Sequence, residues 1–289
     1  MIPILVGAAA LWGVSNMADA ENKTRQANNI NTQAAQIAAR ANRQVSNSHK
    51  NMTKVLDDLG RTKMDLMSGN ISDVANVMGK IYKNFKLNND TQGLRELEEG
   101  GINLSLISEM HDLSTKALEL QNTKEFQSTG TGSFCAVGAL GGAVLGLGVI
   151  AAPAMLLYSF MKTDEAEAAL YEAKTRLDEA RYYEERSKNI SALFNAIAKR
   201  GKQIDDLLNG LNHYFNSAVR QMKDAVKKEG YTWKKYSDDS KAIIFYTFQI
   251  AQTVKMIVDT SMVQEDWSIN PDIEKPIQIG SQTFELLSE

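Results

Sequence analysis

One stretch of this chain, from Phe126 to Met161, carries no charged residue over its 36 positions. Within it, in the run GALGGAVLGLG, glycine recurs at every fourth position, at Gly138, Gly142 and Gly146. In a helix exposed to water each glycine costs roughly 1 kcal/mol relative to alanine. In lipid, small residues spaced by four let two helices pack closely. The spacing therefore indicates a glycine zipper, a helix-packing face made of glycines, that works in a membrane.

The length of this glycine-zipper segment (residues 126–161) limits how it enters a bilayer. One span needs about 20 apolar residues and two need about 40 with a turn, so the segment is long for one span and short for two. Either a single helix kinks at Pro153, or two short halves form a hairpin that turns at residues 146–148. We favour the hairpin, because long helical sequences enter and leave the segment. A core hairpin of a soluble bundle is less favoured, because residues 136–148 lack large side chains.

The residues expected to act in the membrane form two groups. Three glycines and one proline pack and shape the segment, and four large apolar side chains contact lipid or its interface. The set is Gly138, Gly142, Gly146, Pro153, Phe134, Leu156, Leu157 and Phe160.

The rest of the chain predicts an all-α protein. Only four of its 289 residues are proline, and helix-forming residues fill long runs without glycine-proline punctuation. We predict an elongated helical bundle or coiled coil with a central glycine-rich apolar hairpin. Its expected parts are an apolar N-terminal anchor (1–14), a long helix with shorter helices (15–125), the glycine-zipper segment (126–161), long C-terminal helices (162–266) and an extended tail (267–289).

Heptad repeats predict the buried faces of the long helices. In the first helix, one line is Val45, Met52, Leu59 and Leu66, and a thinner second line is Ala34, Ala41, Ser48, Val55 and Thr62. After the segment, one line is Ile190, Ile197, Ile204, Leu211, Ala218 and Ala225, and the other is Phe194, Gly201, Leu208, Phe215 and Met222. Two long helices with buried seams are therefore expected.

Shorter elements follow from local signals. Gly69 and Asn70 suit the end of the first helix, and apolar spacing predicts the next helix over residues 71–85. Residues 88–93 predict a turn, and residues 106–120 another helix. A helix over 237–263 contains the charge-free run AIIFYTFQIAQTV, which we interpret as a buried central helix rather than a membrane span.

Motifs typical of enzymes do not occur in the sequence. His49, His111 and His213 stand far apart, and neither HExxH, GxxxxGK[ST] nor GxSxG is present. The single cysteine, Cys135, allows no intramolecular disulfide and no cysteine-based zinc site within one chain. We expect no enzymatic activity, no catalytic or metal-binding residue, no cofactor and no small-molecule substrate.

Charge gives little indication of a partner, because the net charge is −3. One modest basic and aromatic cluster stands near Gly230: Arg220, Lys223, Lys227, Lys228, Lys234 and Lys235 with Tyr231 and Trp233. Such a cluster suits anionic lipid or nucleic acid. The favoured interpretation is that its cations complement the dipole of a helix C-terminus. No nucleic-acid partner is expected.

The N-terminal run MIPILVGAAALWGV has no preceding Lys or Arg and no obvious cleavage site. We therefore expect synthesis in the cytoplasm without a cleaved signal peptide, and membrane association in the active state.

Long heptad helices, one apolar insertion and the absence of catalytic motifs resemble the helical pore-forming toxins of the cytolysin A type. The local sequence, including VKMIVDTSM at 254–262, is similar to that of uncharacterised bacterial glycine-zipper coiled-coil proteins. The expected function is that of a membrane-active helical protein that inserts the segment, oligomerises with itself or a related helical partner, and forms a pore in a lipid membrane. The alternative is a membrane-tethered coiled-coil scaffold or assembly component that permeabilises nothing, including a virion or conduit component.

Overall fold

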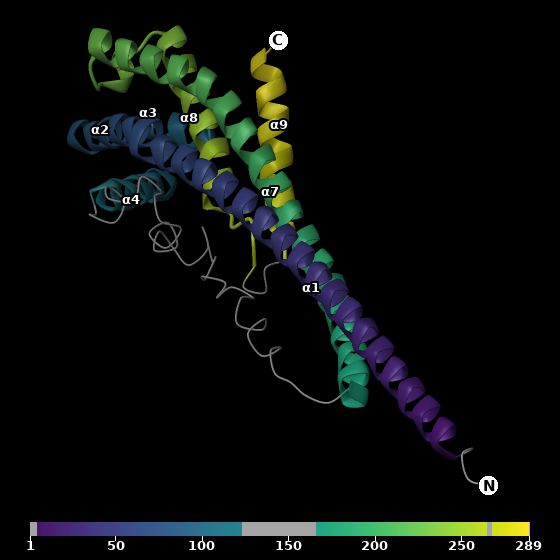
Figure 1. Ribbon diagram of the computed structural model, residues 1–289. Coiled ribbons are helices and arrows are strands. Elements are labelled where there is room, and N and C mark those ends of the chain that lie inside the picture. The colour runs from purple at the N-terminus through teal and green to yellow at the C-terminus, as the bar shows by residue number, and fades with distance from the viewer. Residues whose placement is uncertain (1–4, 123–165, 265–267, 289) are drawn as a thin grey trace. The chain divides into compact units, whose positions relative to one another are not determined.

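The computed structural model describes residues 5–122, 166–264 and 268–288, with the side chains of 21–122, 170–264 and 268–288. These residues are helical apart from short connections and one isolated antiparallel bridge between Val263 and Ile269. Figure 1 colours the helices by their order in the chain, from purple at the N-terminus to yellow at the C-terminus. The all-α class and the helical bundle are confirmed. The glycine-zipper segment, and with it the expected hairpin, lies outside the described residues.

The first helix is longer than the sequence predicts. Helix α1 runs from Leu5 to Leu66, so it already begins within the apolar N-terminal stretch. A π-helical turn, Met67–Ile71, and helix α2, Ser72–Asn88, follow it without interruption. The prediction that Gly69 ends the first helix is therefore wrong. A π-turn holds one residue more than an α-turn, so the chain absorbs this glycine and stays helical.

This π-turn moves the buried face of the helix by one position. Leu59 and Leu66 are buried and lie seven residues apart, as the heptad predicts. The next position in sevens would be Asp73, whose side chain is 38% exposed. The residues that are fully buried are instead Val74 and Ile81. One extra residue in the turn accounts for this shift, because it rotates the following helix against the heptad frame.

Two further helices precede the glycine-zipper segment. The turn expected over 88–93 is confined to Asn89, which adopts a left-handed conformation with φ 47°, and Asp90. Asp90 then caps a short helix, α3, Thr91–Glu99, that the sequence does not predict. Helix α4, Leu104–Gln121, matches the helix expected over 106–120.

Among the described residues, the longest helix lies in the C-terminal half. Helix α7, Ala166–Glu229, is a single helix of 64 residues. A 3₁₀ turn, Trp233–Lys235, connects it to helix α8, Asp238–Asp259. Ten residues distributed around α8 are buried, from Ser240 to Val258, so the central position expected for this helix is confirmed.

The extended tail expected over 267–289 is wrong, because this part is mostly helical. A 3₁₀ turn, Pro271–Ile273, leads into helix α9, Glu274–Ser288. Pro276 lies in the first turn of α9, where a proline costs no intrahelical hydrogen bond. Gly280 lets α9 approach α8, since a Cβ there would lie 2.6 Å from Cδ1 of Ile257.

The described residues fall into two compact units, each considered by itself. The first holds residues 5–51 and 166–195, and the second holds 52–122, 196–264 and 268–288. In the first unit, the buried positions recur in sevens on both helices and are mostly small. We call them the small-residue seam: Ala27, Ala34, Ala41 and Ser48 in α1, and Ala173, Ala180 and Ser187 in α7.

The second unit has a core of large side chains. The heptads of α7 continue there with Ile197, Ile204, Leu208, Leu211, Phe215 and Met222, all fully buried as the sequence predicts. Core residues of α2, α4 and α8 also lie in this unit, and α2 packs on both α4 and α8. The same heptad in α7 therefore carries small side chains in the first unit and large ones in the second.

Candidate functional site

The residues predicted to act in the membrane all lie outside the described residues. Gly138, Gly142, Gly146, Pro153, Phe134, Leu156, Leu157 and Phe160 belong to residues 123–165, on which the structure gives no information. What the structure shows is the helix on each side: α4 ends at Gln121, and α7 begins at Ala166. In the parts that the structure describes, no helix is both long enough and apolar enough to span a membrane.

The helix before the segment is fixed to the second unit. Met110 and Ala117 of α4 are fully buried. Near its C-terminal end, the Gln121 side-chain amide donates a hydrogen bond of 2.9 Å to Oγ of Ser68 in the π-turn. The chain therefore enters the glycine-zipper segment from a helix held by apolar packing and by a polar contact.

One of the two aromatic residues in the basic cluster near Gly230, Trp233, is not a surface feature. Trp233 is only 1% exposed, and its ring meets those of Phe85, Tyr236 and Phe245 edge to face. Its indole N–H donates a hydrogen bond of 2.8 Å to Oε2 of Glu96. Trp233 is thus a core residue, and it is not available to contact lipid or nucleic acid.

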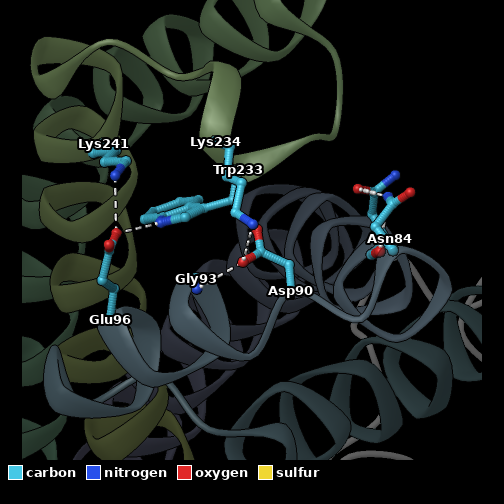
Figure 2. Close-up of polar contacts among 8 residues, drawn as sticks. Asn84, Asp90, Gly93, Glu96, Trp233, Lys234 and Lys241 are labelled. Carbon is cyan, nitrogen blue, oxygen red and sulfur yellow. Dashed lines mark hydrogen bonds and ion pairs between the residues drawn. The ribbon is translucent and has the colours of Figure 1, made fainter.

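Figure 2 shows how α3 holds this tryptophan. Glu96 accepts hydrogen bonds from Nζ of Lys241 and from the Trp233 indole, each 2.8 Å long. The hydrogen bond from Lys241, followed by that from Trp233, keeps the pKa of the Glu96 carboxyl below its usual range. Nearby, Asp90 accepts from the backbone N–H of Gly93 at 3.1 Å and pairs with Lys234 at 3.3 Å. The short helix α3 is therefore a structural clasp for Trp233.

Replacing Gly93 by alanine tests this close packing. A Cβ at this position would lie 2.5 Å from Cε1 of Phe85 and 2.8 Å from Cδ1 of Trp233. We expect the free energy of unfolding to fall by about 1–3 kcal/mol, since overpacking outweighs the better helix propensity of alanine. The control is Gly79→Ala in α2, where no atom lies within 4 Å of the added Cβ. Urea unfolding should show the control unchanged or stabilised by up to about 1 kcal/mol; equal results for both variants would contradict the clasp.

Two lysines of the cluster, Lys223 and Lys227, face helix α2 across an open groove. The basic groove, as we call it, has a volume of about 670 Å³ and lies between α2 and the C-terminal end of α7. Its polar lining is Asp73, Asn76, Lys80, Lys223, Lys227 and Tyr231. Nζ of Lys223 lies 2.5 Å from Oδ2 of Asp73. This ion pair connects the two walls of the groove.

Two lysines of the groove have no carboxylate partner among the described residues. Nζ of Lys80 lies over the Tyr231 ring, 5.4 Å from its centroid, and Lys227 makes no ion pair or hydrogen bond in this part of the chain. Both are exposed. Val77 and Val226 also line the groove and are each only 8% exposed, so most of the surface that the groove presents to solvent is polar. The groove therefore carries two exposed lysines that no carboxylate of the described residues neutralises.

A buried lysine, Lys63, lies elsewhere in the second unit. Its side chain is 2% exposed, and its ammonium donates a hydrogen bond of 3.1 Å to the backbone carbonyl of Val258, near the C-terminal end of α8. Burial lowers the pKa of Lys63 to about 8, although the nearby Asp259 carboxylate acts in the opposite direction. The sequence gives no sign of this burial, because the carbonyl that accepts the hydrogen bond is 195 residues away.

Next to it, a charge network ties α4 to α8. Nζ of Lys255 lies 2.5 Å from Oδ2 of Asp259 and 2.9 Å from Oε2 of Glu109. Burial alone would lower the pKa of Lys255, but the hydrogen bonds to Asp259 and Glu109 outweigh it, and the pKa is raised. Within the described residues, no group of His, Cys, Asp or Glu is arranged to hold a metal ion.

Comparison with known proteins leaves these sites to be interpreted from their own chemistry. The chain matches no protein-family model, no curated protein and no solved structure.

Proposed function

We propose that this protein is a membrane-active helical protein that inserts its glycine-zipper segment into a lipid bilayer, oligomerises and opens a pore. The observation that carries the proposal is the segment itself: no charge from Phe126 to Met161, with glycine at every fourth position in its first half. Helices associate in lipid through close packing of small residues, because lipid offers no hydrophobic drive between them. The spacing of the glycines fits that requirement.

The helices on either side support the proposal in different ways. Helix α4 precedes the segment and belongs to the second unit, which has a core of large side chains. The ion pair between Lys255 and Glu109 and the hydrogen bond between Gln121 and Ser68 hold α4 in this unit. After the segment, α7 begins in the unit that has the small-residue seam. One end of the segment is thus attached to a well-packed unit and the other to a weakly packed helix pair. Such a helix pair can separate at a low cost in free energy while the second unit stays folded.

The test replaces two zipper glycines, as Gly142→Leu with Gly146→Leu. Leucine side chains prevent close helix contact, so we expect the rate of dye release from liposomes to fall about ten-fold or more, equivalent to about 1.4 kcal/mol. The matched control is Ala139→Leu with Ala143→Leu, which adds similar bulk at the same spacing on a neighbouring face. It should release dye at nearly the rate of the unsubstituted protein.

Flotation of the same liposomes separates the possible outcomes. Flotation with dye release supports the pore. Flotation without dye release supports the alternative, a membrane-tethered scaffold or assembly component. If the glycine variant floats and releases dye as the unsubstituted protein does, the zipper has no role and the proposal is wrong.

A further inference from the structure

The basic groove brings together lysines from helices that are far apart in the sequence. Lys80 belongs to α2, whereas Lys223 and Lys227 belong to the last turns of α7. Three lysines and a tyrosine face one groove of about 670 Å³ against a single carboxylate, Asp73. The groove is open to solvent and is large enough to admit a small anionic group.

Complementing the helix dipole explains only part of this charge. Lys227 lies in the last turn of α7, where a cation is favourable whatever else it does. Lys80 has no such role, because it lies in the interior of α2, and yet it lines the same groove. The ion pair between Asp73 and Lys223 satisfies the one carboxylate of the lining and leaves Lys80 and Lys227 in excess. The groove therefore keeps an uncompensated positive charge.

We propose that the basic groove binds the phosphate group of an anionic phospholipid headgroup. Lysines act as point charges for phosphate, and the Tyr231 hydroxyl is a donor beside them. The groove is open, so a headgroup that stays attached to a bilayer can reach it. This inference rests on the proposed membrane function, and it assigns the first contact with the bilayer to the groove rather than to the glycine-zipper segment.

The test uses the full chain with Lys80→Gln and Lys227→Gln together. The matched control is Lys116→Gln with Lys199→Gln, which removes the same charge from exposed positions outside the groove. Binding is measured by co-flotation with vesicles of phosphatidylcholine alone and of phosphatidylcholine mixed with phosphatidylserine. Each lysine near an anionic surface contributes about five-fold in affinity, so the groove variant should bind the mixed vesicles about 25-fold more weakly. The control should lose much less, and thermal unfolding should show that both variants fold.

Three results would overturn the inference. Equal losses in the groove variant and its control would show that only the overall charge matters. Equal binding of the unsubstituted protein to both kinds of vesicle would show that no anionic headgroup is recognised. If sodium phosphate, exchanged for sodium chloride at equal ionic strength, abolished binding to the mixed vesicles, the ligand would be free phosphate rather than a headgroup.

Measuring dye release distinguishes a failure of this inference from a failure of the proposed function. Release from both kinds of vesicle, unchanged in the groove variant, would refute the groove and leave the pore intact. Flotation that depends on the groove lysines but comes without any dye release would support the groove and refute the pore.

Discussion

Replacing Lys63 by methionine should make the protein more stable at neutral pH and change how its stability depends on pH. The pKa of Lys63 is about 8 in the folded protein and about 10.5 in the unfolded chain. Below pH 8 both states hold the proton, and the folded state carries a buried charge. The cost of that charge is about 3–4 kcal/mol relative to the neutral amine, from a pKa difference of about 2.5 at about 1.4 kcal/mol for each pKa unit.

The pH window follows from the sign of this shift. Between about pH 8 and 10 the unfolded chain binds a proton that the folded protein has released, so stability rises with pH by up to about 1.4 kcal/mol per unit. In Lys63→Met this rise should disappear. The methionine variant also loses the hydrogen bond to Val258, which costs about 1 kcal/mol, so its net gain at pH 7 should be about 2–3 kcal/mol.

Urea unfolding of both proteins from pH 7 to 10 measures this difference directly. Lys199→Met removes an exposed lysine from α7 and controls for the loss of charge; it should keep the rise. Burial raises the pKa of Tyr236 to about 12, so above pH 10 stability falls as the tyrosine of the unfolded chain ionises. That effect is common to all three proteins and cancels in the comparison. A methionine variant whose stability rises as steeply as the control's would show that Lys63 is not the group responsible.

The second large effect concerns the small-residue seam. Hydrogen exchange should be much faster in residues 21–51 and 170–195 than in residues 52–66 and 196–229 of the same two helices. Burying a leucine side chain stabilises a protein by about 2 kcal/mol more than burying an alanine side chain. The four seam positions of α1 therefore contribute several kcal/mol less to stability than four leucines would. Backbone amide hydrogens exchange when the helices open locally, so their exchange rate depends on the free energy of that opening. We expect protection in the first unit to be lower by about 100-fold or more.

Buried polar atoms weaken the first unit further. Among the described residues, three buried side-chain atoms have no hydrogen-bond partner: Oδ1 of Asn31, the hydroxyl of Tyr183 and Oγ of Ser191. All three belong to this unit. An unsatisfied buried group costs about 1–3 kcal/mol. Their concentration where the side chains are small indicates a helix pair that opens before the rest of the protein.

Asn31→Leu tests this directly, because it removes one such atom and adds apolar surface. It should slow exchange across 21–51 and 170–195 by about ten-fold, while Asn29→Leu, at an exposed position of the same helix, should not. If opening precedes insertion, Asn31→Leu should also slow dye release. Equal protection in the two units of the unsubstituted protein would contradict the expectation.

Much of the fold follows from periodicity, and the exceptions have identifiable causes. The heptads of α7 predict its buried face because a regular helix repeats its environment every seven residues. The line of Phe194 extends back in sevens through Ser187, Ala180 and Ala173, so the sequence also contains the small-residue seam of α7. The sequence does not predict helix α9 because this part of the chain holds two prolines, Pro271 and Pro276, although the first turn of a helix accepts proline.

The candidate sites were harder to predict, since they depend on contacts between distant segments. The lysines near Gly230 are visible in the sequence, but their partner Lys80 is not, because only packing of α2 brings it into the basic groove. The sequence groups Trp233 with the basic residues near Gly230, whereas in the structure Glu96 and Gly93 of α3 pack against it. The glycine-zipper segment lies outside the described residues, and its role stays a prediction.

The π-turn at Met67–Ile71 lets the chain carry one residue beyond the heptad count without losing the buried face of α2. If the same residues formed a regular α-helix, Asp73 and Lys80 would stand seven and fourteen residues after Leu66, in the inward positions that Val74 and Ile81 now hold. Two charged side chains would then enter the core, and the basic groove would lose the lysine that α2 contributes. One wider helical turn thus keeps the charges of α2 on the groove and its apolar side chains in the core.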